Sequence, residues 1–156
     1  MNQRKLTDYL VVHAAATRPE MDIGVKDIRK WHMAKGWSDI GYHRVIRRDG
    51  TVENGRDINL VGAHVQGHNS RSIGICLAGG LDSNAQPVDN FTDKQKASLF
   101  YLLTELKSQH PSAKIVGHRD LSPDLDGDGV IEKHEWLKSC PCFNVPKWWD
   151  VCHDNS

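Results

Sequence analysis

Residues 8–16 read DYLVVHAAA, an apolar run that contains two β-branched valines and one histidine, His13. A run of this kind, without regular alternation of polar and apolar residues, is typical of a strand buried on both faces of a sheet. The sequence TRP at residues 17–19 ends the run. We therefore predict a central strand here, with His13 near its carboxyl end.

Two helices are predicted after this strand in the sequence. The first covers residues 24–35 and ends at Gly36, and the second covers residues 92–109 and ends before Pro111. Thr92 and Gln95 have the spacing of a capping box at the start of the second helix. Each helix has one apolar stripe, made of Val25, Ile28 and Trp31 or His32 in the first, and of Leu99, Leu103 and Leu106 in the second.

Further strands are predicted between and after the helices. Their ranges are residues 41–48, 51–53, 72–78 and 115–116, and the Asp49-Gly50 pair indicates a hairpin between the first two. The glycine-rich residues 55–69 are predicted to be a loop, and residues 133–139 and 145–151 to form short helical turns. Alternating strands and helices predict an α/β fold, a single domain over residues 1–156 with a central mixed β-sheet flanked by helices.

The composition excludes several classes of protein. Twenty basic residues balance twenty acidic ones in the 156-residue chain, so we expect no binding to nucleic acid. No run approaches the roughly 18 apolar residues of a membrane span, so we expect no membrane insertion, and we expect a monomer. The apolar core of the N-terminal region is only four residues long, which is too short for a secretory signal. We therefore expect synthesis in a cytoplasm without a signal peptide of its own.

An aspartate-rich loop matches the calcium-binding pattern D-x-[DN]-x-[DN]-G-x5-E at every fixed position. The alternative is a solvated acidic turn, which Asp-Gly repeats also form. Ser122-Pro123 directly before the loop argues against an entering helix, so we expect an EF-hand-like structural clip at residues 124–135. The predicted Ca²⁺ ligands are Asp124, Asp126, Asp128, the Val130 carbonyl, Glu132 and Glu135, with Gly129 at the turn.

His13, His118 and Cys140 form a second group of candidate metal ligands. Both histidines follow predicted strands, and Cys140 lies in a polar loop. Three protein ligands with a fourth position for water is the arrangement of a catalytic zinc site. The separations between these three residues match no short zinc-finger pattern. On spacing alone, the alternative stays open that they are an unrelated strand histidine, turn histidine and buried thiol.

Six stretches, in this order along the chain, resemble the zinc-dependent N-acetylmuramoyl-L-alanine amidases of type 2. That family includes amidase endolysins of phages and the peptidoglycan recognition proteins. The resemblance covers nearly the whole chain. The stretches are VVHAAAT (11–17), GYHRVIRRDGTVENGRD (41–57), VGAHVQGHNSRSIGICLAGG (61–80), FTDKQ (91–95), VGHRDL (116–121) and KSCP (138–141).

The resemblance implies a role for each candidate residue. His13, His118 and Cys140 match the zinc ligands, Tyr42 matches the catalytic tyrosine, and Lys138 matches the catalytic lysine of the phage branch. The implied fold is a mixed sheet flanked by helices. The implied reaction is hydrolysis of the amide that joins N-acetylmuramic acid to L-alanine in peptidoglycan.

Tyr42 and Lys138 are then expected to face the oxyanion of the tetrahedral intermediate. No carboxylate stands out as the general base. Without the resemblance, Tyr42 could be a half-buried strand tyrosine and Lys138 a solvated lysine. His64 and Asn69 lie in the loop that forms the groove in this family and are candidates for substrate binding, with a plain surface-loop role equally open.

The chain departs from the phage pattern between His118 and Cys140, where the calcium-type loop lengthens the connection. We hypothesise that Ca²⁺ folds this insertion so that Lys138 and Cys140 reach the zinc. Either sulfur of Cys140 and Cys142 could bind metal, and a pairing of one of them with Cys152 stays open, although the resemblance favours Cys140 as the ligand.

The sequence thus predicts a phage endolysin that acts on the cell wall in the periplasm after release. The first alternative is a recognition module that binds peptidoglycan without cleaving it, against which Cys140 argues because members that lack activity typically lack the cysteine ligand. The second is a calcium-regulated protein with a structural zinc site, which predicts that Tyr42→Phe leaves function intact.

Overall fold

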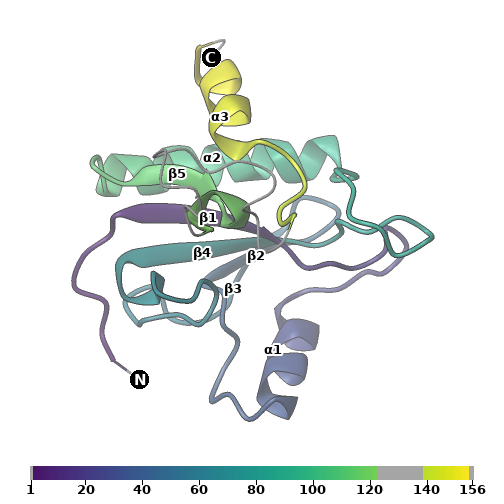
Figure 1. Cartoon of the computed structure of the whole chain (residues 1–156), viewed down its shortest axis with the longest axis horizontal. Helices are drawn as coiled ribbons and strands as arrows, with labels where there is room; N and C mark the ends of the chain where they lie inside the picture. Colours follow the sequence, from purple (N-terminus) through teal and green to yellow (C-terminus); the bar gives the residue numbers. More distant parts are fainter. Residues whose placement is uncertain (1, 123–138, 155–156) are drawn as a thin grey trace.

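The computed structural model of the chain describes residues 2–122 and 139–154. At its centre lies a five-stranded sheet with the order β3-β2-β4-β1-β5 (Figure 1). β1 pairs in parallel with β4 and β5, β2 pairs in parallel with β4, and β3 pairs antiparallel with β2. The sheet is therefore mixed, with β1 near its middle, as predicted. The strands are β1 (Tyr9–Ala14), β2 (Arg44–Ile46), β3 (Val52–Asn54), β4 (Ser72–Leu77) and β5 (Lys114–Gly117).

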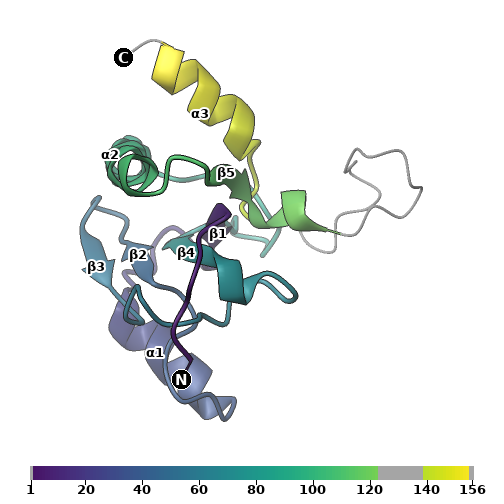
Figure 2. The same ribbon diagram turned by 90° about the vertical axis from the view of Figure 1, so that its left-hand side faces the viewer.

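Helices cover both faces of this sheet. Figure 2 shows α1 (Val25–Ala34) on one side and α2 (Asp93–Gln109) with α3 (Val145–Asp154) on the other. The capping box of α2 is confirmed, because the Thr92 hydroxyl accepts from the Gln95 N–H and Gln95 Oε1 accepts from the Thr92 N–H, both at 3.0 Å. The predicted α/β class with a central mixed sheet is confirmed. Within the described part of the chain, none of the helices combines the length and apolar character that a membrane span requires.

Successive side chains of a strand point to opposite faces of the sheet, so the buried apolar residues form two clusters. The larger cluster joins the sheet to α2 and α3 and contains Leu10, Val12, Ile73, Ile75, Leu77, Leu99, Leu103 and Val145. The smaller cluster joins the sheet to α1 and contains Val25, Ile28, Ile40, Val45, Cys76 and Ala78. His13 lies between Val12 and Ala14 of the larger cluster, so its side chain projects from the α1 face of the sheet.

Some element boundaries differ from the prediction. The strand predicted over residues 41–48 is limited to β2, because the Gly41 N–H donates to His32 Nδ1 and the Gly41 carbonyl accepts from Ala63, outside the sheet ladder. Two short 3₁₀ helices, Asn69–Arg71 and His118–Leu121, were not predicted, and α3 is longer than the predicted 145–151. The hairpin is confirmed by the Arg47 N–H, which donates to the Thr51 carbonyl at 2.9 Å. Residues 133–138 of the predicted turn at 133–139 lie outside the described residues.

Candidate metal centre and active site

Two parallel strands bring the two candidate histidine ligands together. Val12 of β1 pairs with Gly117 of β5, so the residues that follow these two lie side by side at the carboxyl ends of the parallel strands. These residues are His13 and His118, and their ring centroids are 4.7 Å apart. His13 is only 1% exposed. The register of β1 and β5 therefore creates the histidine pair, although 104 residues lie between the two in the sequence.

Cys140 reaches this pair through contacts with the sheet edge. The Ala14 N–H donates to Cys140 Sγ at 3.1 Å, and the Arg119 N–H donates to the Cys140 carbonyl at 2.9 Å. Pro141 packs directly on Gly117, where an added Cβ would lie 2.7 Å from Pro141 Cδ. β1 and the residues that follow β5 therefore fix the position of Cys140. None of the four cysteines, all of which lie in the described residues, takes part in a disulfide.

The three side chains have the geometry and chemistry of a metal site. One potential ligand atom from each of His13, His118 and Cys140 lies within 4.8 Å of the other two. Two imidazole nitrogens and one thiolate sulfur are the donors that Zn²⁺ prefers, and three protein ligands leave a position for water. The donor set therefore fits a zinc ion of the catalytic type.

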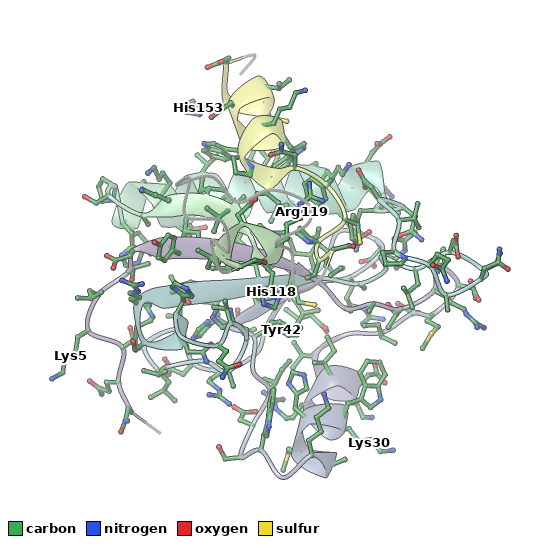
Figure 3. All side chains as sticks on the ribbon, in the orientation of Figure 1. Lys5, Lys30, Tyr42, His118, Arg119 and His153 are labelled. Carbon is green, nitrogen blue, oxygen red and sulfur yellow. The ribbon has the colours of Figure 1, made fainter. Side chains whose placement is uncertain are left out.

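Tyr42 lies beside His13 and lines the same cavity as the histidine pair, and Figure 3 labels Tyr42 and His118. Its ring centroid is 5.0 Å from that of His13. Burial is the main cause that raises the pKa of the Tyr42 hydroxyl well above its ordinary value, and a side-chain hydrogen bond with Cys76 contributes. The hydroxyl is therefore protonated at neutral pH and can donate a hydrogen bond to a developing negative charge.

His64 and Asn69 both lie at this site, with different contacts. His64 Nδ1 is 2.9 Å from His13 Nε2, and burial lowers the pKa of His64 well below its ordinary value. Asn69 Oδ1 accepts hydrogen bonds of 2.8 Å from the backbone N–H groups of His64 and Val65. Asn69 therefore fixes the loop, and His64 contacts a candidate metal ligand. Neither contact could be predicted from the sequence, because both depend on how the loop folds over β4.

A cavity of about 710 Å³ opens over the metal centre. Both candidate substrate-binding residues, His64 and Asn69, line it together with Tyr42 and the three metal-ligand candidates. Among the described residues that line the cavity there is no aspartate or glutamate. The α1 side also contributes residues that were not predicted as part of the site, namely Trp31, His32, Lys35 and Trp37.

His43 follows Tyr42 and has a structural position. It is fully buried, its Nδ1 accepts from the Gly74 N–H at 3.0 Å, and its Nε2 donates to the Leu60 carbonyl at 2.8 Å. Burial is the main cause that lowers the pKa of His43 to about 4. This neutral imidazole ties the loop that precedes His64 to the central strand β4.

The remaining predicted site residues lie outside the described residues, which omit 123–138. This applies to Lys138 and to the whole predicted calcium loop. The residues concerned are Asp124, Asp126, Asp128, Val130, Glu132 and Glu135.

Comparisons with known proteins show which family the chain belongs to. The protein family described as N-acetylmuramoyl-L-alanine amidase matches residues 2–141. The endolysin of Klebsiella phage KP32 is 45% identical over 148 residues, which cover 95% of this chain and 89% of that protein. Among solved structures, the N-acetylmuramoyl-L-alanine amidase LysC from Clostridium intestinale URNW superposes with a TM-score of 0.72 at 26% identity, over 99% of this chain and 93% of that one. Bumblebee PGRP-SA shares the fold, with a TM-score of 0.68 at 23% identity over 94% and 86% of the two chains.

Proposed function

This chain belongs to the N-acetylmuramoyl-L-alanine amidase family, and we propose from that premise that it is a zinc-dependent, peptidoglycan-degrading amidase. It hydrolyses the amide bond between N-acetylmuramic acid and the L-alanine of the stem peptide. The observation that carries the zinc dependence is the cluster of His13, His118 and Cys140, whose potential ligand atoms lie within 4.8 Å of one another. The similarity to phage endolysins covers almost the full length of both chains, which supports the same role in lysis.

His13, His118 and Cys140 are the residues that would hold the zinc ion. When bound, Zn²⁺ supplies a Lewis acid that polarises a carbonyl and lowers the pKa of a water molecule to about 7. A contact within the chain favours the metal-binding form of Cys140 before any metal is bound. The Ala14 N–H donates to Cys140 Sγ, and a hydrogen bond from a backbone amide stabilises the thiolate form of a cysteine.

Tyr42 and Lys138 are the proposed stabilisers of the oxyanion that forms when the scissile carbonyl becomes tetrahedral. For Tyr42, the support is its place on the cavity wall beside His13 and its protonated hydroxyl. For Lys138, the support is its position two residues before Cys140, since Cys140 itself lies in the cavity wall. A donor of this kind is worth about 10²–10³ in rate.

Residues 124–135 are proposed to bind Ca²⁺ as an EF-hand-like loop inserted in this single domain. The support is the sequence pattern, in which oxygen ligands occur at every position that the loop requires. In the sequence, this loop ends three residues before Lys138 and five before Cys140. Ca²⁺ would act by holding the segment that carries Lys138.

The proposed site of action is the cell wall, reached from the periplasm after synthesis in the host cytoplasm and release. Peptidoglycan is the proposed partner. Residues of α1 and of the loop that carries His64 both line the cavity above the candidate metal centre. We also propose a monomer without nucleic-acid partners or membrane insertion.

The test of the proposed function uses purified peptidoglycan and the full-length protein. Metal-free protein, protein with zinc, and protein with zinc plus calcium are assayed for released stem peptides with a new amino-terminal L-alanine. Cleavage only in the zinc-containing samples is expected. Binding to peptidoglycan without cleavage in every sample would instead favour the recognition-module alternative.

A further inference from the structure

The His64 side chain is enclosed between His13 and the central strand β4. Its ring lies directly over Gly74, where an added Cβ would be 2.5 Å from His64 Cγ. Gly62 makes a second close approach, since a Cβ there would be 2.8 Å from His64 Cδ2. The two glycines make room for the imidazole, and the hydrogen bonds that Asn69 Oδ1 accepts from the His64 and Val65 N–H groups hold the loop in place.

Both ring nitrogens of His64 have a polar neighbour. Nδ1 lies 2.9 Å from His13 Nε2, and Nε2 lies 3.2 Å from Ser72 Oγ. Ser72 is fully buried, and its Oγ also lies 2.8 Å from the His68 carbonyl oxygen. A row of hydrogen bonds therefore runs from the first residue of β4 to a candidate metal ligand.

The positions of the protons in this row follow from which groups can donate. A carbonyl only accepts, so the 2.8 Å contact is a hydrogen bond only if the single Ser72 hydroxyl proton points to His68. Ser72 Oγ then accepts from His64 Nε2–H. With one proton on the neutral ring, at Nε2, His64 Nδ1 is an acceptor, and it receives the Nε2–H of His13.

We propose that His64, oriented by Ser72, is a positioning residue that selects the tautomer of His13 in which Nε2 carries the proton and Nδ1 is the metal-binding nitrogen. This inference rests on the proposed zinc function. A metal-bound histidine generally donates its second ring N–H to an outer acceptor, which fixes the ring and increases the basicity of the ligand atom. Here another imidazole takes the place of the usual carboxylate or carbonyl acceptor.

This assignment differs from a role for His64 in binding substrate. His64 lines the cavity, but both of its ring nitrogens have partners within the protein. A substrate-binding histidine affects the Michaelis constant and leaves the metal-free protein unchanged. A positioning histidine changes the metal affinity and the tautomer of His13 before any substrate is added.

The test compares four variants with the wild-type protein. His64→Phe removes the acceptor but keeps a planar ring, and His64→Asn keeps an oxygen near the place of Nδ1. Ser72→Ala removes the hydroxyl that contacts His64 Nε2 without altering either histidine, and it leaves the hydrogen bond between His64 and the Ser72 backbone in place. His68→Phe is the matched control. It removes an imidazole from the same loop, and this imidazole contacts Arg71 and Tyr9.

Two measurements are made on each protein. Nitrogen-15 NMR of the metal-free protein identifies the protonated nitrogen of His13, and competition with a chromophoric chelator gives the zinc dissociation constant. His64→Phe should give mixed His13 tautomers and bind zinc about 10–100-fold more weakly. His64→Asn should recover most of the affinity, Ser72→Ala should show a smaller loss, and His68→Phe should match the wild type.

Wild-type zinc affinity in His64→Phe, together with an unchanged His13 tautomer, would overturn the inference. So would an equal loss in His64→Asn and His64→Phe, because the acceptor would then not matter. If the wild-type protein itself bound no zinc, the proposed function would fail, whereas the NMR measurement on metal-free protein would still decide the tautomer. The two failures are therefore distinguishable.

Discussion

At the scale of single residues, His13 is the point at which the site converges. The ring centroids of Tyr42, His64 and His118 all lie within 5.0 Å of its own, and Cys140 joins it in the metal-ligand cluster. The sequence identified His13, His118 and Cys140 as candidates because of their residue types and their places after predicted strands. It could not identify the His64–His13 contact, because only the folded loop brings the two residues together.

Substitution of Tyr42 by phenylalanine should slow the reaction and leave the metal site intact. The ring of phenylalanine fills the same space but has no hydroxyl to donate to the oxyanion. We expect kcat to fall by about 10²–10³, with an unchanged zinc content. Steady-state hydrolysis of peptidoglycan fragments and metal analysis provide the two measurements.

Tyr101→Phe is the matched control for this substitution, because Tyr101 is 71% exposed on α2. It should behave as the wild type does. Full activity in Tyr42→Phe would remove Tyr42 from the mechanism and favour a structural zinc site.

His43 should make the free energy of unfolding depend on pH. Its pKa is about 4 in the folded protein against 6.5 in the unfolded chain, so the unfolded state binds the proton first as the pH falls. The stabilisation is therefore complete above pH 6.5 and is lost as the pH falls toward 4. Between pH 7 and pH 4.5, we expect this one group to remove about 2 kcal/mol of stability.

Urea denaturation at the two pH values measures this loss. His43→Gln should be less stable at pH 7 but should show a smaller difference between the two pH values than the wild type. An equal difference in both proteins would show that His43 is not the buried neutral group described here.

At the level of secondary structure, the two faces of β4 have different roles: one packs in the apolar core and the other contacts residues of the site. Ile73, Ile75 and Leu77 belong to the apolar cluster under α2. On the opposite face, Ser72 and Gly74 contact His64, and Cys76 hydrogen-bonds to Tyr42. The predicted strand at residues 72–78 is confirmed, and all six residues of β4 are buried. The small residues at every second position leave room for other side chains to pack against one face.

The close contact between β5 and the Cys140 segment should be sensitive to a single methyl group. In Gly117→Ala, the new Cβ would lie 2.7 Å from Pro141 Cδ and 3.3 Å from Val145 Cγ2. The proline ring has little freedom to move aside, so the segment that carries Cys140 must shift. We expect a loss of about 1–3 kcal/mol in the free energy of unfolding and weaker zinc binding.

Thermal denaturation and the chelator competition assay measure these two effects. Lys114→Ala, at an exposed position of the same strand, is the control and should change neither. An unchanged zinc affinity in Gly117→Ala would mean that Cys140 is not held through Pro141.

At the scale of the whole molecule, the sequence predicted the architecture well because its signals were local. Apolar runs predict strands, the Asp49-Gly50 pair predicts a hairpin, and the Thr92 capping box predicts the start of a helix. Each of these signals lies within a short stretch of sequence. The strand order β3-β2-β4-β1-β5 and the register of β1 against β5 were not predicted. Strand order and register depend on pairing between residues distant in sequence, which no local pattern encodes. This pairing brings His13 and His118 together.

Removal of calcium should affect the whole enzyme if residues 124–135 form the proposed clip. Zinc-loaded protein with added calcium should unfold at a higher temperature and retain activity longer than zinc-loaded protein without it. Glu135→Gln, which removes a predicted bidentate ligand, should abolish the response to calcium. Asp57→Asn, at an exposed position in another loop, is the control. Identical stability and activity with and without calcium in the wild type would contradict the clip.

His13, His118 and Cys140 are proposed to hold a catalytic zinc ion in an amidase, and the zinc-dependent release of stem peptides from purified peptidoglycan tests this proposal. Metal-free protein should be inactive, and one equivalent of Zn²⁺ should restore the release of peptides that begin with L-alanine. Cys140→Ser should show neither stoichiometric zinc binding nor release. Full cleavage by metal-free protein, or by Cys140→Ser at the wild-type rate, would contradict the claim.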